Sequence, residues 1–518
     1  MNGAESLIRT LTAHGVGVCF ANPGTSEMHL VQAVDAVDEM RAVLCLFEGV
    51  CTGAADGYGR MKGLPATTLL HLGAGLGNGI ANLHNCRRAG TPLINVVGDH
   101  AIHHVAHDAP LTSDIEAVAK PVSAWIRTSR TSMGVGLDTV DAVQAALAPR
   151  PDPRGGISTL ILPADCSWGE GRTQPKGPGF DDTITPAPVP GSDIEAAARL
   201  IGPDTMLLID GSGLRQGAAI VAAGRIAAKT GCSLYTPTFP ARVEAGPELP
   251  IVERLPYFPE QILSLMASVK RLVLLGAQAP VSFFAYQNLP GYLVPDGCEV
   301  TTLAHRHEDV AKALEDLASA LDANAEPARP QGERPPVPEG GLSARAIAAI
   351  VAARAPQNSI VAADSGGGGA AFPVMQRTVP HSWLNLTGGS IGGGGPVALG
   401  AAIACPDRPV FALLGDGGAM YTNQFLWTAA RENANVTTVI YSNRQYNILE
   451  VEYRRLGVNE IGPRAASMFD LSNPDLDWTK LAEAQGVPAT RATTCEDFDA
   501  QLTQAITEDG PHLIEAVL

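Results

Sequence analysis

Two polar residues that could hold a divalent cation follow two apolar runs in the last third of the chain. Asp416 comes soon after the run Val410–Leu414, and Asn443 comes directly after the run Val436–Ser442. Each run has the length and composition of a buried parallel strand, and Tyr421–Glu432 between them favours a helix. Since the carboxyl ends of parallel strands meet at one edge of a sheet, both side chains can reach a single ion. Their oxygens suit Mg²⁺ or Ca²⁺.

Glycines on both sides of Asp416 indicate a phosphate group as the second ligand. Gly415, Gly417 and Gly418 let a backbone approach phosphate closely, and the helix that follows presents its positive N-terminus. A Gly-Asp-Gly tripeptide alone is more simply explained as a strand-to-helix turn. The flanking strands and Asn443 favour the metal and diphosphate interpretation instead.

This arrangement resembles the signature of the thiamine diphosphate (ThDP) enzymes, in particular the group containing acetolactate synthase, benzoylformate decarboxylase, pyruvate decarboxylase and pyruvate oxidase. The family motif usually ends in two asparagines, and here the first of them is Ser442. The resemblance implies that Asp416 and Asn443 ligate the metal together with the backbone carbonyl of Gln445. It also implies that the glycines around Asp416 bind the cofactor.

A carboxylate near the N-terminus fits the same family. Glu48 follows the strand expected over Ala42–Phe47 and opens a helix of small residues, Gly49–Tyr58. A lone glutamate there could simply be a first-turn acid favoured by the helix dipole. The run Leu46–Tyr58 resembles the family segment whose glutamate hydrogen-bonds N1′ of the cofactor, which implies that Glu48 is catalytic. The small residues permit close approach of another surface, for which we consider a second subunit.

A histidine and a threonine are further candidates for contact with the substrate. His71 follows the strand expected over Ala66–Leu70, and a glycine-rich run then opens a helix expected over Gly79–Arg88. The resemblance to benzoylformate decarboxylase implies that His71 lies beside the substrate and that Thr25 replaces a serine contacting the substrate carboxylate. A core histidine bonded to the backbone is the alternative for His71. Thr25 or Ser26 could also cap the next helix.

Two more glycine-rich loops in the last third fit a cofactor site. Asp364–Gly369 can wrap a diphosphate with backbone N–H groups, including those at Ser365 and Gly366. A flexible turn is the alternative for this loop. The resemblance implies that Ile391 is the apolar wedge that keeps the cofactor bent, and that the carbonyl of Gly389 accepts a hydrogen bond from N4′.

Four histidines follow the strand expected over Pro92–Val97. His100, His103, His104 and His107 invite a metal interpretation. The adjacent His103 and His104 would point apart on a helix or a strand, so we favour a polar active-site loop.

The middle of the chain carries weaker signals. Gly211-Ser-Gly213 follows a strand but lacks the third glycine of a dinucleotide fingerprint. Acetolactate synthases bind FAD in this domain, which is short here, so we expect no FAD. Benzoylformate decarboxylase carries a second catalytic histidine in a segment resembling Ala279–Gln287. The counterparts here are Ala285 or Tyr286, which argues against benzoylformate itself as the substrate.

The length and the linkers predict three domains. The 518 residues are too many for one ordinary domain. Stretches rich in glycine and proline, Gly169–Asp193 and Ala325–Gly341, divide the chain into three pieces in which strands and helices alternate. This alternation predicts an α/β fold with doubly wound parallel sheets. We expect a pyrimidine-binding domain over 1–170, a central domain over 190–325 and a diphosphate-binding domain over 340–518.

Charge and cysteine content restrict partners and compartment. The formal net charge of −17 argues against nucleic acid or an anionic membrane as a partner, and no apolar run has the length of a membrane span. Nine cysteines without C-x-x-C spacing, together with an N-terminus that does not resemble an export signal, predict a cytoplasmic protein with free thiols.

Together these features predict a ThDP-dependent 2-oxo acid decarboxylase or carboligase, similar to acetolactate synthase in sequence and to benzoylformate decarboxylase in its active-site residues. The resemblance implies a homodimer or homotetramer whose cofactor lies between the first domain of one subunit and the third domain of another. The alternatives are an acetolactate synthase that joins two pyruvates and a non-catalytic relative that only binds ThDP. The sequence leaves open which 2-oxo acid is used and whether the product is an aldehyde or a carboligation product.

Overall fold

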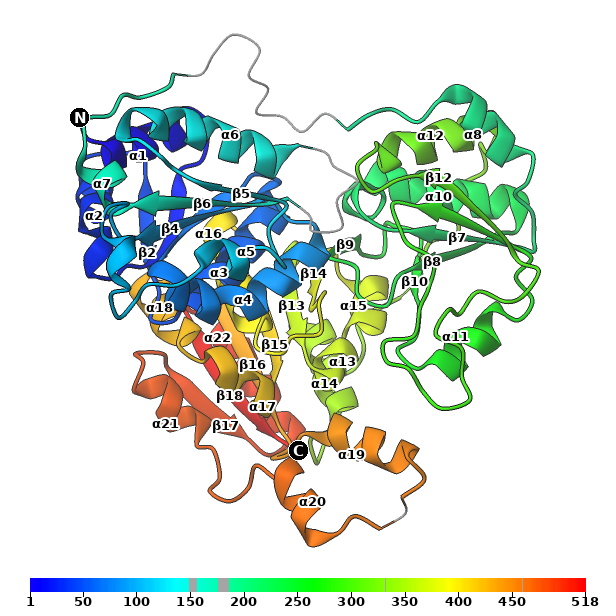
Figure 1. Cartoon of the computed structure of the whole chain (residues 1–518). Helices are drawn as coiled ribbons and strands as arrows, with labels where there is room; N and C mark the ends of the chain where they lie inside the picture. The colour runs from blue at the N-terminus through cyan, green and yellow to red at the C-terminus, as the bar shows by residue number, and fades with distance from the viewer. Residues whose placement is uncertain (149–155, 176–185, 331, 459) are drawn as a thin grey trace.

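Three β-sheets organise the chain (Figure 1). The structure is a computed structural model that describes residues 1–148, 156–175, 186–330, 332–458 and 460–518. Residues 176–185 of the first expected linker and residue 331 of the second lie outside the described residues. In Figure 1 the first and third sheets lie one above the other, and the second sheet lies to their side.

The first sheet has six parallel strands in the order β2-β1-β3-β4-β6-β5. Its strands are β1 Val18–Asn22, β2 Arg41–Leu44, β3 Ala66–Leu70, β4 Leu93–Asp99, β5 Trp125–Thr128 and β6 Ile157–Pro163. Its helices are α1 Gly3–Ala13, α2 Met28–Asp35, α3 Glu48–Lys62, α4 Leu72–Ala89, α5 Ile115–Ala119, α6 Val135–Leu147 and α7 Ala164–Trp168. Apolar side chains of α1 and α6 cover one face, and those of α3 and α4 cover the other.

The second sheet has five parallel strands in the order β10-β8-β7-β11-β12. Its strands are β7 Thr205–Ile209, β8 Ser233–Thr236, β10 Glu253–Arg254, β11 Arg271–Leu275 and β12 Glu299–Ala304. Its helices are α8 Gly191–Ala198, α9 Ser212–Arg215, α10 Gly217–Thr230, α11 Pro259–Met266 and α12 Val310–Ala320.

The third sheet has seven strands in the order β17-β18-β16-β15-β13-β14-β9, and only β9 runs antiparallel to its neighbour. Its strands are β9 Arg242–Ala245, β13 Ser359–Asp364, β14 His381–Asn385, β15 Val410–Gly415, β16 Val436–Ser442, β17 Ala489–Ala492 and β18 His512–Val517. Its helices are α13 Ala344–Arg354, α14 Gly366–Gly369, α15 Phe372–Thr378, α16 Gly394–Ala404, α17 Asp416–Ala419, α18 Phe425–Arg431, α19 Asn447–Arg455, α20 Pro463–Phe469, α21 Trp478–Glu483 and α22 Cys495–Thr507. Because β9 comes from the middle of the chain, it fastens the central region to this sheet.

The fold class is confirmed: three α/β units carry parallel, doubly wound sheets. Three element boundaries were wrong. The strand expected over Ala42–Phe47 ends at Leu44, the helix expected over Tyr421–Glu432 begins at Phe425, and the helix expected over Gly79–Arg88 begins at Leu72. Tertiary contacts explain the early start of α4, because neighbouring groups lie where Cβ atoms on Gly73, Gly75 and Gly79 would be.

The small residues of α3 pack against α16 of the same chain, which corrects the expectation of a second subunit at this surface. A Cβ atom on Gly53 would lie 2.6 Å from Cβ of Pro396. Cβ atoms on Gly57 and Gly400 would overlap backbone atoms of the opposite helix. The absence of side chains at these positions lets the two helices touch through their backbones. The first and third sheets therefore share one hydrophobic core.

The remaining sequence expectations about thiols and membranes can be compared with the structure. All nine cysteines are free thiols, and seven of them are buried. Within the part of the chain that the structure describes, no helix is long and apolar enough to cross a membrane.

We expect Gly400→Ala to destabilise the protein by about 1–3 kcal/mol, because the added methyl group must push α3 and α16 apart. Urea unfolding followed by circular dichroism measures this loss. Gly191→Ala is the control, because a Cβ atom there has no neighbour within 4 Å. If both variants unfold at the same urea concentration as the parent, the close approach of α3 and α16 does not limit stability.

Candidate active site

The loops that carry the predicted diphosphate and metal residues lie at one edge of the third sheet. Strands β13, β15 and β16 are neighbours, with Asp364 in register with Leu414 and Gly415 in register with Tyr441. Because all three strands are parallel, the loops that follow them leave the sheet at the same edge. The structure thus brings together Ser365, Asp416 and Asn443, which are far apart in the sequence.

Asp416 is buried at the start of α17, and its carboxylate accepts two backbone hydrogen bonds. Oδ1 accepts from the Gly417 N–H at 2.8 Å, and Oδ2 accepts from the Arg444 N–H at 2.6 Å. Burial raises the pKa of the Asp416 carboxyl, and the nearby Glu515 adds to this effect. A divalent cation at this carboxylate would offset the cost of burying the charge.

The turn after β16 holds the other two predicted metal ligands beside Asp416. Arg444 has a positive φ of 57°, and its N–H points to Asp416. The exposed Asn443 accepts a hydrogen bond at Oδ1 from the Gln445 N–H at 3.2 Å. Among the described residues, no group of three or more His, Cys, Asp and Glu side chains is placed to hold a metal. A metal at this turn would therefore need amide, carbonyl and cofactor oxygens besides Asp416.

Glycines and short helix starts leave room for a diphosphate beside the Asp416 turn. Ser365 caps α14 by accepting a hydrogen bond from the Gly368 N–H at 2.8 Å. A Cβ atom on Gly366 would have no neighbour within 4 Å, and one on Gly415 would lie 3.4 Å from Cβ of Ser365. The N-terminal N–H groups of α14 and α17 follow the adjacent strands β13 and β15, so both can point to one anion.

Ile391, the predicted apolar wedge, lies next to the loops that carry Ser365 and Asp416. It is 37% exposed, and its Cβ is 3.7 Å from the position of a Cβ atom on Gly418. Gly389 has a positive φ of 75°, and a Cβ atom there would lie 2.5 Å from Cζ of Phe283. A large apolar side chain thus lies beside the glycine-rich loop that follows β15, as a bent cofactor would require.

Glu48 and His71 form a second group at the edge of the first sheet. Glu48 is buried at the start of α3, and its Oε2 accepts a hydrogen bond from Asn78 Nδ2 at 3.0 Å. A Cβ atom on Gly75 would lie 3.1 Å from Oε1 of Glu48 and 3.4 Å from Cβ of His71. Glu48 Oε1 and the Cβ atom of His71 therefore lie next to the same point, the Cβ position of Gly75.

Glu27 is a member of this group that sequence reasoning missed. Its buried Oε2 lies 2.8 Å from His71 Nδ1 and also accepts from the Gly24 N–H at 2.8 Å. Its Oε1 accepts from Ser26 Oγ at 2.8 Å. The three-residue offset between Gly24 and Glu27, as in a capping box, was the sequence signal that could have found it.

The prediction that Thr25 or Ser26 caps the next helix needs correction, whereas the contact of Thr25 with the substrate carboxylate stays a prediction. Neither side chain caps the following turn, because the carboxylate of Glu27 reaches back to the Gly24 N–H instead. Thr25 is exposed, and the hydroxyl found beside His71 belongs to Ser26, whose Oγ is 3.3 Å from Nδ1. The structure therefore brings Ser26 and Glu27 to His71.

The four histidines after β4 form a surface loop. The His104 ring lies between those of His100 and His107, with centroid distances of 5.5 Å and 5.4 Å. His103 points elsewhere, and its Nδ1 is 3.9 Å from Asp165 Oδ2. The two adjacent histidines do point apart, as the sequence indicated.

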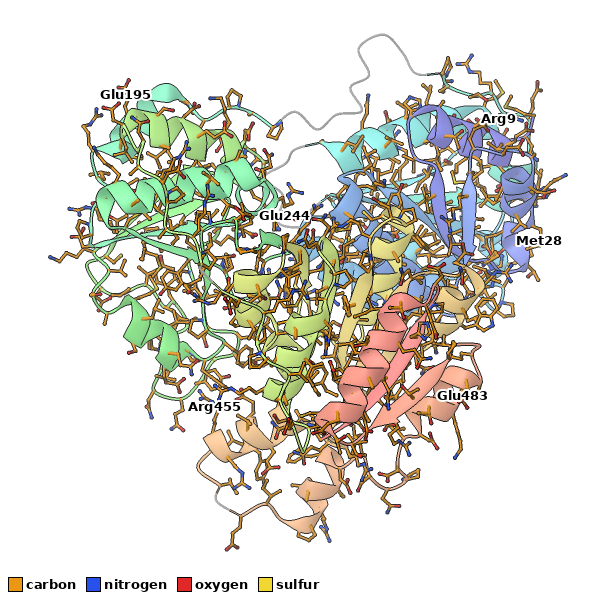
Figure 2. The ribbon with its side chains drawn as sticks, turned by 180° about the vertical axis from the view of Figure 1, so that it is seen from behind. Arg9, Met28, Glu195, Glu244, Arg455 and Glu483 are labelled. Carbon is orange, nitrogen blue, oxygen red and sulfur yellow. The ribbon has the colours of Figure 1, made fainter. Side chains whose placement is uncertain are left out.

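The segment Ala279–Gln287 contacts the loop that carries Gly389 and Ile391, and Phe283 makes this contact. Tyr286 instead donates a hydrogen bond to Glu452 at 2.9 Å and lies under Arg455, whose guanidinium carbon is 4.4 Å from the ring centroid. Figure 2 shows Arg455 where α19 meets the central domain. Of the two expected counterparts of the second histidine, Tyr286 serves this domain contact, and the residue that touches Gly389 is Phe283.

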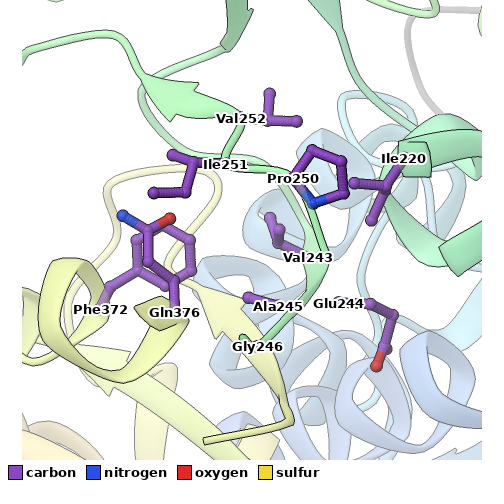
Figure 3. A pocket seen from close by; sticks show the side chains of 10 residues that line it. All are labelled: Ile220, Val243, Glu244, Ala245, Gly246, Pro250, Ile251, Val252, Phe372 and Gln376. Atoms are coloured by element: carbon purple, nitrogen blue, oxygen red, sulfur yellow. The ribbon is translucent and has the colours of Figure 1, made fainter. Parts of the chain in front are cut away.

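The pocket shown in Figure 3 lies away from these groups. It is formed where β9 and the segment after it approach α15, and its lining includes Val243, Ile251 and Phe372. None of the predicted site residues lines it.

Within the described chain, no hydrogen bond or ion pair joins Glu48 or His71 to the residues around Asp416. The site residues thus form two groups, one at the edge of the first sheet and one at the edge of the third.

Comparison with known proteins identifies relatives over the whole chain. The family described as thiamine pyrophosphate enzyme, N-terminal TPP binding domain, matches residues 1–118, and the corresponding C-terminal TPP binding domain matches residues 346–516. The "Putative acetolactate synthase large subunit IlvX" of Mycobacterium tuberculosis is 49% identical, covering 100% of this chain and 99% of the relative. Benzoylformate decarboxylase of Pseudomonas aeruginosa is 29% identical, covering 98% and 96%.

A solved structure supports the same grouping. The thiamine diphosphate-dependent 4-hydroxybenzoylformate decarboxylase of Rhodococcus jostii superposes with a TM-score of 0.84 at 25% identity, covering 99% of this chain and 98% of that one.

We expect Glu27→Gln to lower the free energy of unfolding by about 1–3 kcal/mol, because an amide cannot accept from all the donors that surround this buried carboxylate. Chemical denaturation measures the loss. Glu5→Gln is the control, since Glu5 only pairs with Arg9 near the surface, and we expect a change below about 0.5 kcal/mol. Equal stability of parent and Glu27→Gln would show that the carboxylate is not needed to hold His71.

Proposed function

Because the chain belongs to the thiamine pyrophosphate enzyme family, we propose that it is a ThDP-dependent 2-oxo acid decarboxylase or carboligase. It is related to proteins named acetolactate synthase large subunit and benzoylformate decarboxylase. Benzoylformate is a 2-oxo acid, and acetolactate is a product of carbon–carbon bond formation. The two names therefore represent the two reactions that we propose, decarboxylation of a 2-oxo acid and carboligation.

The observation that carries the proposal is that Glu48 Oε1 and His71 Cβ both lie within 3.4 Å of one point, the position of a Cβ atom on Gly75. A protein that only binds ThDP needs the diphosphate and metal loops, but it has no use for an acid and a histidine side by side at the other half of the site. A carboxylate and an imidazole are the side-chain groups that most often transfer protons to and from reacting atoms. This pair favours an enzyme over a non-catalytic relative.

The group around Asp416 is proposed to bind the diphosphate end of the cofactor. The carboxylate of Asp416, the amide of Asn443 and the carbonyl of Gln445 would hold Mg²⁺ or Ca²⁺. Backbone N–H groups would bind the phosphate oxygens; they belong to Ser365, Gly366, Gly415, Gly417 and Gly418. The open space at Gly366 and the raised pKa of the Asp416 carboxyl fit an anion and a cation bound at this edge.

The chain's own residues would divide the work around the reacting atoms. Bound ThDP supplies the carbon nucleophile and the electron sink that loss of CO₂ requires. Glu48 would share a proton with N1′ of the cofactor, the Gly389 carbonyl would accept from N4′, and Ile391 would support the bent shape. The Nδ1–H of His71 would donate to the Glu27 carboxylate, which leaves Nε2 as the ring nitrogen that can take up and release a proton.

We propose a homodimer or homotetramer in which the two groups of site residues meet across a subunit interface. Among the described residues, no hydrogen bond or ion pair joins the Glu48 group to the Asp416 group of the same chain, and this supports the arrangement. The proposal includes no flavin. The nine free cysteines favour the cytoplasm as the compartment.

Acetolactate synthesis from two pyruvates is the second candidate, and the relative at 49% identity favours it. Purified protein with ThDP and Mg²⁺ should be incubated with pyruvate, benzoylformate and branched 2-oxo acids, each with and without an aldehyde acceptor. Release of CO₂ with an aldehyde product supports a decarboxylase, and acetolactate from pyruvate supports the second candidate. If no 2-oxo acid loses CO₂, the proposed function is wrong.

Glu48→Gln should slow deprotonation of C2 of bound ThDP by about 10²–10⁴-fold, because the amide keeps the volume but cannot cycle a proton with N1′. Proton–deuterium exchange at C2, stopped with acid and followed by NMR, measures this step without knowledge of the substrate. Glu39→Gln, an exposed acid of the same domain, is the control. Exchange at the parent rate in Glu48→Gln would reduce Glu48 to a helix-start acid.

Asp416→Ala should weaken ThDP binding in the presence of Mg²⁺ by about 100-fold or more, because it removes the anionic ligand of the ion. Titration calorimetry with ThDP and Mg²⁺ measures the affinity. Asp475→Ala is the matched control, since this exposed carboxylate pairs with Arg444 of the same turn. If the affinity of Asp416→Ala for ThDP equals that of the parent, Asp416 is not a ligand of the metal.

A further inference from the structure

The backbone on both sides of Ile391 is held by side chains. Before it, the Ser390 N–H donates to Asn85 Oδ1 at 3.2 Å, and the Ser390 carbonyl accepts from Asn85 Nδ2 at 2.8 Å. After it, the Gly392 N–H donates to Asp364 Oδ2 at 2.8 Å, and the Gly392 carbonyl accepts from Thr422 Oγ1 at 2.6 Å. Both polar backbone groups of each neighbour are therefore fixed, and the wedge between them is fixed with them.

The hydrogen bonds before and after Ile391 come from different domains. Asp364 ends β13 and Thr422 follows α17, so both belong to the third sheet's own unit. Asn85 belongs to α4, which covers the first sheet. The N-terminal domain thus reaches the loop that presents Ile391 in the same chain.

An amide is the side-chain group that suits this position. The Ser390 N–H needs an acceptor and the Ser390 carbonyl needs a donor, and an amide supplies one of each from a single planar group. Asn85 is 1% exposed, and its Nδ2 also donates to Asn82 Oδ1 at 3.0 Å, which sets the orientation of the amide. Water cannot readily replace these bonds at a buried site.

Further contacts tie the preceding residues of the loop to α4. Thr387 Oγ1 donates to the Asn85 carbonyl at 2.6 Å, and His84 Nε2 lies 3.1 Å from the Gly388 carbonyl oxygen. A Cβ atom on Gly388 would lie 2.6 Å from Asn85 Oδ1. The loop therefore runs directly over the end of α4, and only glycine fits at this contact.

We propose that Asn85 is a positioning residue that sets Ile391 and the Gly389 carbonyl for the cofactor bound by the third domain. The inference rests on the proposed function, because it takes residues 389–391 as cofactor-binding. The N-terminal half of α4 carries Asn78, which donates to Glu48, and the helix begins next to His71. One helix of 18 residues thus supports the proton-transfer group with its N-terminal half and the cofactor loop with its C-terminal half.

The test compares Asn85→Ala with Asn95→Ala. Asn95 is the matched control, since it is a fully buried asparagine of the same domain whose amide bonds Thr68 and Thr159. In the protein without cofactor, we expect amide hydrogen exchange over residues 387–394 to be faster in Asn85→Ala and unchanged in Asn95→Ala. With ThDP and Mg²⁺, we expect Asn85→Ala to weaken cofactor binding about tenfold and to slow C2 exchange at saturating ThDP by about tenfold to hundredfold.

Asn85→Asp keeps the inference testable if Asn85→Ala does not fold. The carboxylate preserves size and the acceptor for the Ser390 N–H, but it cannot donate to the Ser390 carbonyl, so we expect the same changes in the same direction. If exchange over 387–394, ThDP affinity and the C2 rate in the folded Asn85 variant all match those of Asn95→Ala, the inference is overturned.

The result also separates this inference from the proposed function. If the parent protein binds no ThDP, the proposed function fails. The inference fails with it, because the loop then has no cofactor to position. Faster amide exchange in the cofactor-free Asn85 variant would in that case show only that Asn85 holds the loop. If the parent binds ThDP and releases CO₂ from a 2-oxo acid while the Asn85 variant behaves as the control, only the inference fails.

Discussion

The hydrogen bond from the Arg444 N–H to the carboxylate of Asp416 connects the ends of β15 and β16, and the rest of the diphosphate half depends on it. A buried carboxylate without donors would be costly, so the chain must bring backbone N–H groups to it. The left-handed backbone at Arg444 does so, and it turns Asn443 and Gln445 toward the same edge. Tyr446 then packs on Gly417, where a Cβ atom would overlap its ring. One buried charge thus fixes the conformation of two loops.

Arg60 performs the equivalent task between domains. Its guanidinium forms a buried ion pair with Asp56 on α3 and donates to the carbonyl of Asn385 at the end of β14. It also donates to the Ala241 carbonyl next to β9. Removing either charge would leave the other buried without its partner, which is far more destabilising than loss of a surface pair. The first, central and third units are therefore joined at one guanidinium, close to where α3 and α16 touch through their backbones.

Local sequence patterns predicted these strands of the third sheet well, because a buried parallel strand is a short apolar run. Val436–Ser442 matches β16 residue for residue, and Asp416 begins α17 directly after β15. Contacts between distant segments could not be predicted this way. The contact of Glu27 with His71 joins residues 44 positions apart in the sequence, and the partner of the small α3 residues proved to be α16. The pairing of β9 with β14 and the contact of Phe283 with Gly389 belong to the same class.

Ser442, which replaces the first asparagine of the family motif, is held by a contact with a distant part of the chain. Ser442 is the last residue of β16, and its buried Oγ donates to Glu515 Oε1 on β18 at 3.0 Å. Glu515 also accepts from Arg491 at 2.8 Å, so the serine belongs to a polar chain inside the sheet's edge. Asn443 is exposed beyond the strand end. The replacement at position 442 therefore affects the contact with Glu515, whereas the amide of Asn443 bonds the Gln445 N–H in the turn that follows.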